Sequence, residues 1–206
     1  MVLLIWYRKQ FALARPDQLK GDITPEYGIL DVDTIRHVHQ AVPDCKLFYL
    51  MRNPVERAWS GALMALWRSE LSFEEVSDQW FIDHFKSEGS IKRGDYEACL
   101  KNWLAVYPAS QLLPLFLDQI ESDPIRVLIR CADHLGVDPS PFVQAPVRLV
   151  SKPEFQGPAH PLRESLRPIL EEMYLPKMES LGSFLGIGDP WEPGKRPAAH
   201  AEIYLA

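Results

Sequence analysis

The chain has 206 residues, a length typical of one domain, and 47% of them are apolar, which is enough for a substantial core. A formal net charge of −6 argues against a protein that coats nucleic acid, although one local anion site remains compatible with it. The apolar runs are too short for a transmembrane span, and Cys45, Cys99 and Cys131 lie too far apart for a metal motif or a disulfide framework. We therefore expect free thiols, no bound metal, no nucleic-acid partner and no membrane span.

The N-terminal residues predict no targeting segment. Residues 1–10, MVLLIWYRKQ, are apolar and then basic, which reverses the order of a signal peptide and favours a cytoplasmic protein. Residues 16–28 are rich in turn formers and predict a connector. Residues 32–41 predict a short helix, with Asp31 or Asp33 as its N-cap.

A strand, a turn and a helix follow. Residues 46–52 contain a continuous apolar run, which is typical of a strand buried on both faces of a parallel sheet. Asn53 can cap the next helix, and Pro54 suits its first position because a missing N–H costs nothing there. The helix is expected to run to about Arg68. Its predicted core stripe has helical spacing and consists of Val55, Ala58, Trp59, Ala62, Leu63 and Leu66.

Two more helices are expected before the next strand. Residues 71–86 predict a helix, because Ser72 and Glu75 have the spacing of a capping box. Residues 87–93 are expected to form a polar loop. Residues 94–106 predict a further helix with aromatic and aliphatic side chains along one stripe.

The second half of the chain repeats the alternation of strand and helix. Residues 111–117 predict a strand in which Pro114 favours an edge position or a bulge. Residues 122–136 predict a helix that ends at its final glycine. Residues 162–183 predict a long helix that is broken at Pro176.

Strands that alternate with helices in this way indicate an α/β layered fold. Only two strands are convincing, so a parallel sheet built from them alone is incomplete. We expect one domain over residues 1–192 and a loosely ordered tail over residues 193–206. The tryptophans on helical stripes are expected in the core: Trp59, Trp67, Trp80 and Trp103.

The turn after the first strand is a candidate anion site. A strand that ends at a helix N-terminus offers backbone N–H groups and the positive end of the helix dipole. Arg52 adds a planar donor fork that suits phosphate, and Arg57 and Ser60 are three residues apart on one helix face. The alternative is an arginine paired with a nearby acid and a solvated helix face.

Four segments resemble one known family. Arg52, Asn53, Pro54, Arg57 and Ser60 match the pattern R-[DN]-P-x-x-R-x-x-S, which resembles the 3′-phosphate-binding segment of the sulfotransferases. Three more segments resemble that family in order and spacing: GDITPEY at 21–27, the segment at 94–124, and the segment at 157–186. The last of them resembles the heparan-sulfate-sulfotransferase-like branch. The resemblance covers roughly residues 6–192.

The resemblance implies a fold and an activity. The fold would be a P-loop-NTPase-like three-layer α/β arrangement with a parallel sheet. The activity would be transfer of a sulfuryl group from 3′-phosphoadenosine 5′-phosphosulfate (PAPS) to a hydroxyl or amine of a small-molecule or carbohydrate acceptor, with no metal. Arg52 and Ser60 would hold the 3′-phosphate of PAPS, and Arg57, Gly157 and His160 would also belong to the nucleotide site.

The sequence also departs from that family. No PKxGTT-like loop, which would grip the 5′-phosphosulfate, occurs in the chain, and Ile23 replaces a lysine often found in the first resembling segment. We therefore expect the first strand, the phosphate loop and the catalytic base to be missing, and we assign no catalytic residue. Two hypotheses stay open: a PAPS-dependent enzyme in its full-length form, or an inactive remnant or interaction domain that retains only the 3′-phosphate site.

Overall fold

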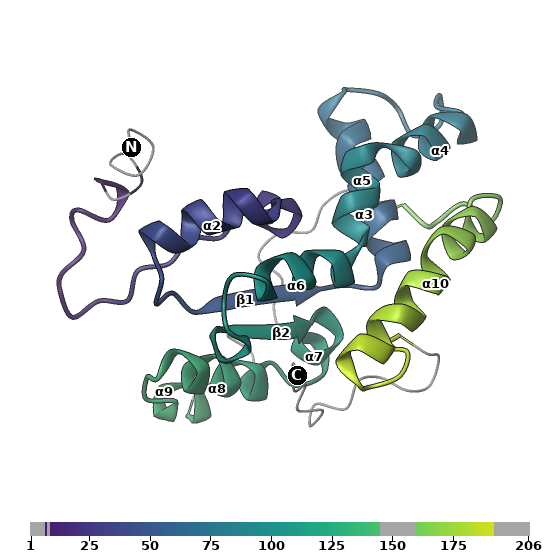
Figure 1. Cartoon of the computed structure of the whole chain (residues 1–206). Helices are drawn as coiled ribbons and strands as arrows, with labels where there is room; N and C mark the ends of the chain where they lie inside the picture. The colour runs from purple at the N-terminus through teal and green to yellow at the C-terminus, as the bar shows by residue number, and fades with distance from the viewer. Residues whose placement is uncertain (1–6, 8, 145–159, 192–206) are drawn as a thin grey trace.

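The computed structural model describes residues 7, 9–144 and 160–191 of the chain, and Figure 1 shows the arrangement of its helices and strands. In chain order the elements are the 3-10 helix η1 (Pro25–Ile29), α2 (Val32–Ala41), β1 (Leu47–Met51), α3 (Pro54–Arg68), α4 (Asp78–Lys86), α5 (Glu88–Gly94), α6 (Tyr96–Leu104), the 3-10 helix η2 (Ala109–Gln111), β2 (Leu112–Phe116), α7 (Leu117–Ser122), α8 (Pro124–Leu135), α9 (Ser140–Val143) and α10 (Arg167–Leu185).

The two strands form a parallel sheet. β1 and β2 pair in continuous register, with Leu47 opposite Leu112 and Met51 opposite Phe116. Helices α2 and α6 lie beside this sheet, while α3, α4, α5 and α10 gather beyond the end to which the strands point (Figure 1). Pro114 takes part in the pairing without a bulge, and β2 has no second partner among the described residues, so the predicted edge position is confirmed.

One face of β1 is less buried than the sequence predicts. Met51 is fully buried, but Phe48 is 41% exposed and Leu50 is 51% exposed. Leu47, Tyr49 and Met51 contribute to the core beside α2 and α6, whereas Phe48 packs edge-on against His134 of α8 on the opposite face. The prediction that β1 is buried on both faces was therefore wrong for the described part of the chain, because α8 covers the face of Phe48 only partly.

The core beside the sheet is closed by aromatic residues whose polar ends find partners. The Tyr107 hydroxyl donates a hydrogen bond to the Val42 carbonyl at 3.1 Å, and the Trp103 indole N–H donates to the Tyr27 carbonyl at 3.0 Å. Buried hydroxyl and indole groups are tolerated when they are paired in this way. Because both bonds span more than sixty residues, they hold the N-terminal segment and α2 against α6.

A second core joins α3, α4 and α10. The buried stripe of α3 packs against Phe81, Leu170 and Tyr174, which confirms the predicted helical stripe. Trp59 and Trp103 are buried as expected, but Trp67 is 64% exposed, so that prediction was wrong. Trp67 lies seven residues after Ser60 and therefore shares the helix face of Ser60, away from the core stripe.

The region between α3 and α6 differs from its prediction. Helix α4 begins at Asp78, and the Ser72 hydroxyl donates to the Glu74 carboxylate, so the expected capping box does not form. The predicted polar loop at residues 87–93 is instead helix α5, whose N-cap Ser87 accepts a hydrogen bond from the Ser90 N–H. The Ser87 cap is enough to start a short helix, although the polar composition of this segment predicted a loop.

The other predicted helices are largely confirmed. Asp31 caps α2 by accepting from the Thr34 N–H, and Gly136 ends α8 in the left-handed conformation. Helix α10 continues through Pro176, so the predicted break was wrong. Buried residues on both sides of that proline pack into the two cores and keep the helix in place. Residues 193–206, the predicted tail, lie outside the described residues.

Gly94 permits a close approach between α5 and α10. A Cβ atom at position 94 would lie 2.9 Å from the Tyr174 hydroxyl oxygen, whereas one at Gly21 would meet nothing within 4 Å. Because Tyr174 is fixed in the core, we predict that Gly94→Ala lowers the free energy of unfolding by about 1–3 kcal/mol through overpacking. Gly21→Ala should change it by less than about 0.5 kcal/mol. Urea titration of both variants measures this, and equal stabilities would contradict it.

Candidate functional site

The turn between β1 and α3 is closed by hydrogen bonds of its own. The Asn53 side-chain oxygen accepts from the N–H groups of Val55, at 3.0 Å, and Glu56, at 3.4 Å. The Asn53 carbonyl accepts from the Arg57 N–H at 2.8 Å, and Pro54 has no N–H. These donors are therefore used internally, which contradicts the expectation that free N–H groups of α3 would hold an anion. An anion would compete with these bonds for the N–H groups of α3, so side chains are the better-placed donors at this turn.

The backbone of Arg52 is held from the other side by α6. The Tyr96 hydroxyl donates a hydrogen bond to the Arg52 carbonyl at 2.8 Å. Burial raises the pKa of Tyr96 to about 12, so the hydroxyl keeps its proton and remains a donor at neutral pH. Tyr96 and Asn53 together fix the backbone from which the Arg52 side chain extends.

The Arg52 side chain itself has an exchangeable partner. Its Nε atom donates to the Glu56 carboxylate at 3.1 Å, and the two side chains are 41% and 60% exposed. An exposed ion pair of this spacing contributes only about 0.3–0.5 kcal/mol. A phosphate, which carries more charge and can accept two parallel bonds from a guanidinium, can therefore replace Glu56 at little cost.

Ser60 and Arg57 occupy one face of α3 as predicted, because the helix forms as predicted. Ser60 is half-buried and lies roughly 9 Å along the helix axis from Pro54. Arg57 points inward. Its Nη2 atom donates to the Ser90 carbonyl at 2.9 Å and to the Tyr174 hydroxyl at 2.8 Å, and its Nε atom is buried without a hydrogen-bond partner.

His160 lies at the start of the described C-terminal part, against the second core. Its ring stacks on Phe73 with centroids 4.1 Å apart, and its carbonyl accepts from the Trp59 indole N–H at 2.8 Å. These contacts place His160 beside α3, on the side of Trp59. Gly157, the other residue predicted from that loop, lies outside the described residues.

Arg163 organises the loop before α4, and the sequence did not predict this role. Its Nη1 atom donates to the Val76 carbonyl at 3.0 Å and the Asp78 carboxylate at 2.7 Å, and Nη2 donates to the Phe73 carbonyl at 2.6 Å. Its guanidinium also lies over the rings of Phe73 and Phe81. No local pattern marks Arg163, because every partner lies more than eighty residues away.

His84 faces α3 next to Ser60. Its Nε2 atom lies 3.9 Å from the position that a Cβ atom would take at Gly61, and its ring stacks on Trp80. Burial lowers the pKa of His84, and the positive charges of Arg57 and Arg93 lower it further. The stacking on Trp80 gives His84 a packing role between α4 and α3.

The described ranges contain neither a cluster of metal ligands nor a helix suited to cross a membrane. Within residues 9–144 and 160–191, no group of three or more His, Cys, Asp or Glu side chains is arranged to hold a metal ion. In the same part of the chain, none of the helices combines the length and apolar character that a membrane crossing requires.

Comparisons with known proteins agree on one family. The model of the sulfotransferase domain matches residues 36–184. Heparan sulfate glucosamine 3-O-sulfotransferase 6 of Mus musculus is 31% identical over 137 residues, which cover 65% of this chain and 40% of that protein. Heparan sulfate glucosamine 3-O-sulfotransferase 3B1 of Mus musculus is 31% identical over 140 residues, covering 65% and 35%. The chain thus spans 35–40% of the length of these curated relatives.

A solved structure has the same fold. The sulfotransferase from Alicyclobacillus acidocaldarius superposes with a TM-score of 0.64 at 23% identity, over 87% of this chain and 69% of that one. The predicted α/β sulfotransferase fold with a parallel sheet is therefore confirmed.

The pKa of His84 predicts a pH dependence of stability. Because the folded pKa lies below the ordinary value of 6.5, the unfolded chain binds the proton more tightly, and stability is lost as the pH falls through 6.5. We predict that His84→Gln reduces the loss of thermal stability between pH 7.5 and pH 5.5. His37→Gln, on the exposed side of α2, is the control. Melting temperatures across that range measure this, and an unchanged pH profile for His84→Gln would contradict it.

Proposed function

Because the chain belongs to the sulfotransferase domain family, we propose that Arg52 and Ser60 bind the 3′-phosphate of PAPS. In this proposal the protein transfers the sulfuryl group of PAPS to a hydroxyl or amine of a carbohydrate. Membership of the family supports sulfuryl transfer in general. The matched relatives are heparan sulfate glucosamine 3-O-sulfotransferases, which supports a carbohydrate acceptor.

The observation that carries the phosphate assignment is the contrast between the backbone and the side chain of Arg52. Tyr96 and Asn53 fix the backbone, while the guanidinium is partly exposed and paired only weakly with Glu56. A donor on a rigid support binds an anion with little loss of entropy. Because the first N–H groups of α3 are already used, the phosphate lies along the first two turns of α3, between Arg52 and Ser60, and not at the helix end.

The chain's own residues then have distinct tasks. Arg52 contributes a charged donor fork and Ser60 a hydroxyl donor, and both recognise the 3′-phosphate without touching the reacting sulfur. Bound PAPS would supply the sulfuryl group and its leaving phosphate. Recognition at this distance serves to position the donor, which is a large part of catalysis in group transfer.

A second candidate function is binding of the 3′-phosphate without sulfuryl transfer. The observation that favours it is that this function needs only the side chains of Arg52 and Ser60, and both lie in the described part of the chain. Incubation of the protein with radiolabelled PAPS and heparan sulfate separates the two functions. Labelled polysaccharide supports the transferase, whereas tight binding of 3′,5′-adenosine bisphosphate without product supports the second candidate.

We predict that wild-type protein binds 3′,5′-adenosine bisphosphate more tightly than 5′-AMP, which lacks the 3′-phosphate. Arg52→Ala should weaken binding of the bisphosphate by about 10- to 100-fold and Ser60→Ala by about 3- to 10-fold, with little change for 5′-AMP, because charged hydrogen bonds are the stronger ones. Isothermal titration calorimetry measures both ligands.

The matched control is Arg36→Ala, which removes another exposed arginine that is paired with an acid on its own helix. Its affinity for the bisphosphate should equal that of wild type. If Arg52→Ala and Ser60→Ala also bind like wild type, the phosphate is held elsewhere.

A further inference from the structure

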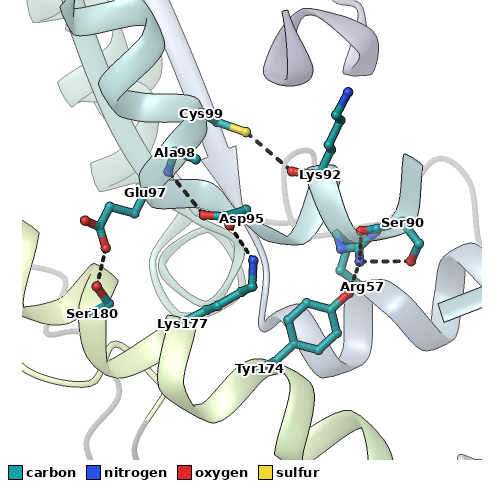
Figure 2. A network of polar contacts seen from close by, with 10 residues as sticks. All are labelled: Arg57, Ser90, Lys92, Asp95, Glu97, Ala98, Cys99, Tyr174, Lys177 and Ser180. Atoms are coloured by element: carbon teal, nitrogen blue, oxygen red, sulfur yellow. Dashed lines mark hydrogen bonds and ion pairs between the residues drawn. The ribbon is translucent and has the colours of Figure 1, made fainter. Parts of the chain in front are cut away.

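Helix α10 turns a row of polar side chains toward α3, α5 and α6 (Figure 2). Tyr174, Lys177 and Ser180 follow at intervals of three residues and so share one helix face. Lys177 forms an ion pair with Asp95, and the Ser180 hydroxyl donates to the Glu97 carboxylate at 2.5 Å. Those two contacts join α10 to the start of α6. The third, from Tyr174, reaches α3.

Tyr174 contacts Arg57, a half-buried cation whose Nε atom is buried. The Tyr174 hydroxyl accepts from Arg57 Nη2, which also donates to the carbonyl of the buried Ser90, and Figure 2 shows this junction. In the described part of the chain the hydrogen bonds of Arg57 run to the neutral oxygens of Ser90 and Tyr174, and its Nε atom has no hydrogen-bond partner. Because the buried Nε atom makes no hydrogen bond, the two bonds from Nη2 are the contacts that restrict where this half-buried guanidinium lies.

Arg57 stands between the two residues of the proposed phosphate site. It follows Arg52 by five residues and precedes Ser60 by three, on the same face of α3 as Ser60. The Arg52 end of the site is fixed by Tyr96 of α6, as described above. The Ser60 end has a separate attachment, through Arg57, to Ser90 of α5 and Tyr174 of α10.

We propose that Tyr174 is a positioning residue for the 3′-phosphate site. Its hydroxyl holds Arg57, and through Arg57 it sets the position at which α3 presents Ser60 relative to Arg52. This inference rests on the proposed function, and it assigns Arg57 to the support of the site and not to contact with the phosphate.

The surroundings of Tyr174 allow a clean test. Its ring is 1% exposed, packed in the second core and closely approached by Gly94. Phenylalanine keeps that ring and removes only the oxygen that accepts from Arg57. Ser180→Ala is the matched control, because it removes one hydroxyl from the same face of α10 whose partner lies on α6.

We expect Tyr174→Phe to weaken binding of 3′,5′-adenosine bisphosphate by about 3- to 10-fold in calorimetry, and to leave 5′-AMP unchanged. Ser180→Ala should change neither affinity. The double variant Tyr174→Phe/Arg57→Met should bind the bisphosphate no more weakly than Arg57→Met alone, because both substitutions break the same hydrogen bond between Tyr174 and Arg57. The proposal is overturned if Tyr174→Phe prefers the bisphosphate over 5′-AMP by the same affinity ratio as wild type. That includes the case in which both affinities fall by the same factor.

Hydrogen exchange of the backbone decides the same question without a ligand. Amides of residues 58–61 of α3 should exchange faster in Tyr174→Phe and at the wild-type rate in Ser180→Ala. Unchanged exchange at those amides, or a uniform increase over all helices, would overturn the proposal. If wild type fails to prefer the bisphosphate over 5′-AMP, the proposed function fails, while the exchange result still shows whether Tyr174 holds α3.

Discussion

The capped junction between β1 and α3 is the constraint on which the site depends. A buried strand end at Met51 leads within two residues to a helix whose first N–H groups are all used or absent. The direction of α3, and with it the place of Ser60, follows from that cap. The same cap uses the N–H groups with which a helix N-terminus usually attracts an anion, so in the proposed site recognition falls to side chains. Arg52, held by a rigid backbone and a weak ion pair, is the group suited to that task.

Helices α6 and α10 hold two arginines at the start of α3 in place. Tyr96 of α6 holds the carbonyl of Arg52, and Tyr174 of α10 holds the guanidinium of Arg57. Both tyrosines are buried and contribute their hydroxyl groups to positions on one short segment. Burial lowers the pKa of His84 beside α3, and the positive charges of Arg57 and Arg93 lower it further.

Residues that act through long-range contacts were beyond sequence reasoning. Arg163 binds carbonyls and a carboxylate more than eighty residues away, and Tyr174 meets Arg57 across 117 positions. Hydrogen bonds of this kind leave no periodicity or spacing in the sequence. Arg57 shows the consequence: its place in a motif predicted a ligand contact, whereas its described hydrogen bonds run into the protein interior.

By itself the sequence determined the features that depend on neighbours in the chain. The Asn53 and Asp31 caps, the stripe of α3 and the glycine end of α8 follow from local sterics and helical period, and the ordered motifs identified the family. Tertiary structure alone decided how far α8 covers Phe48, whether α10 continues through Pro176, and where Arg57 points. Those outcomes depend on which elements pack together, because burial and buried hydrogen bonds are set by partners distant in the chain.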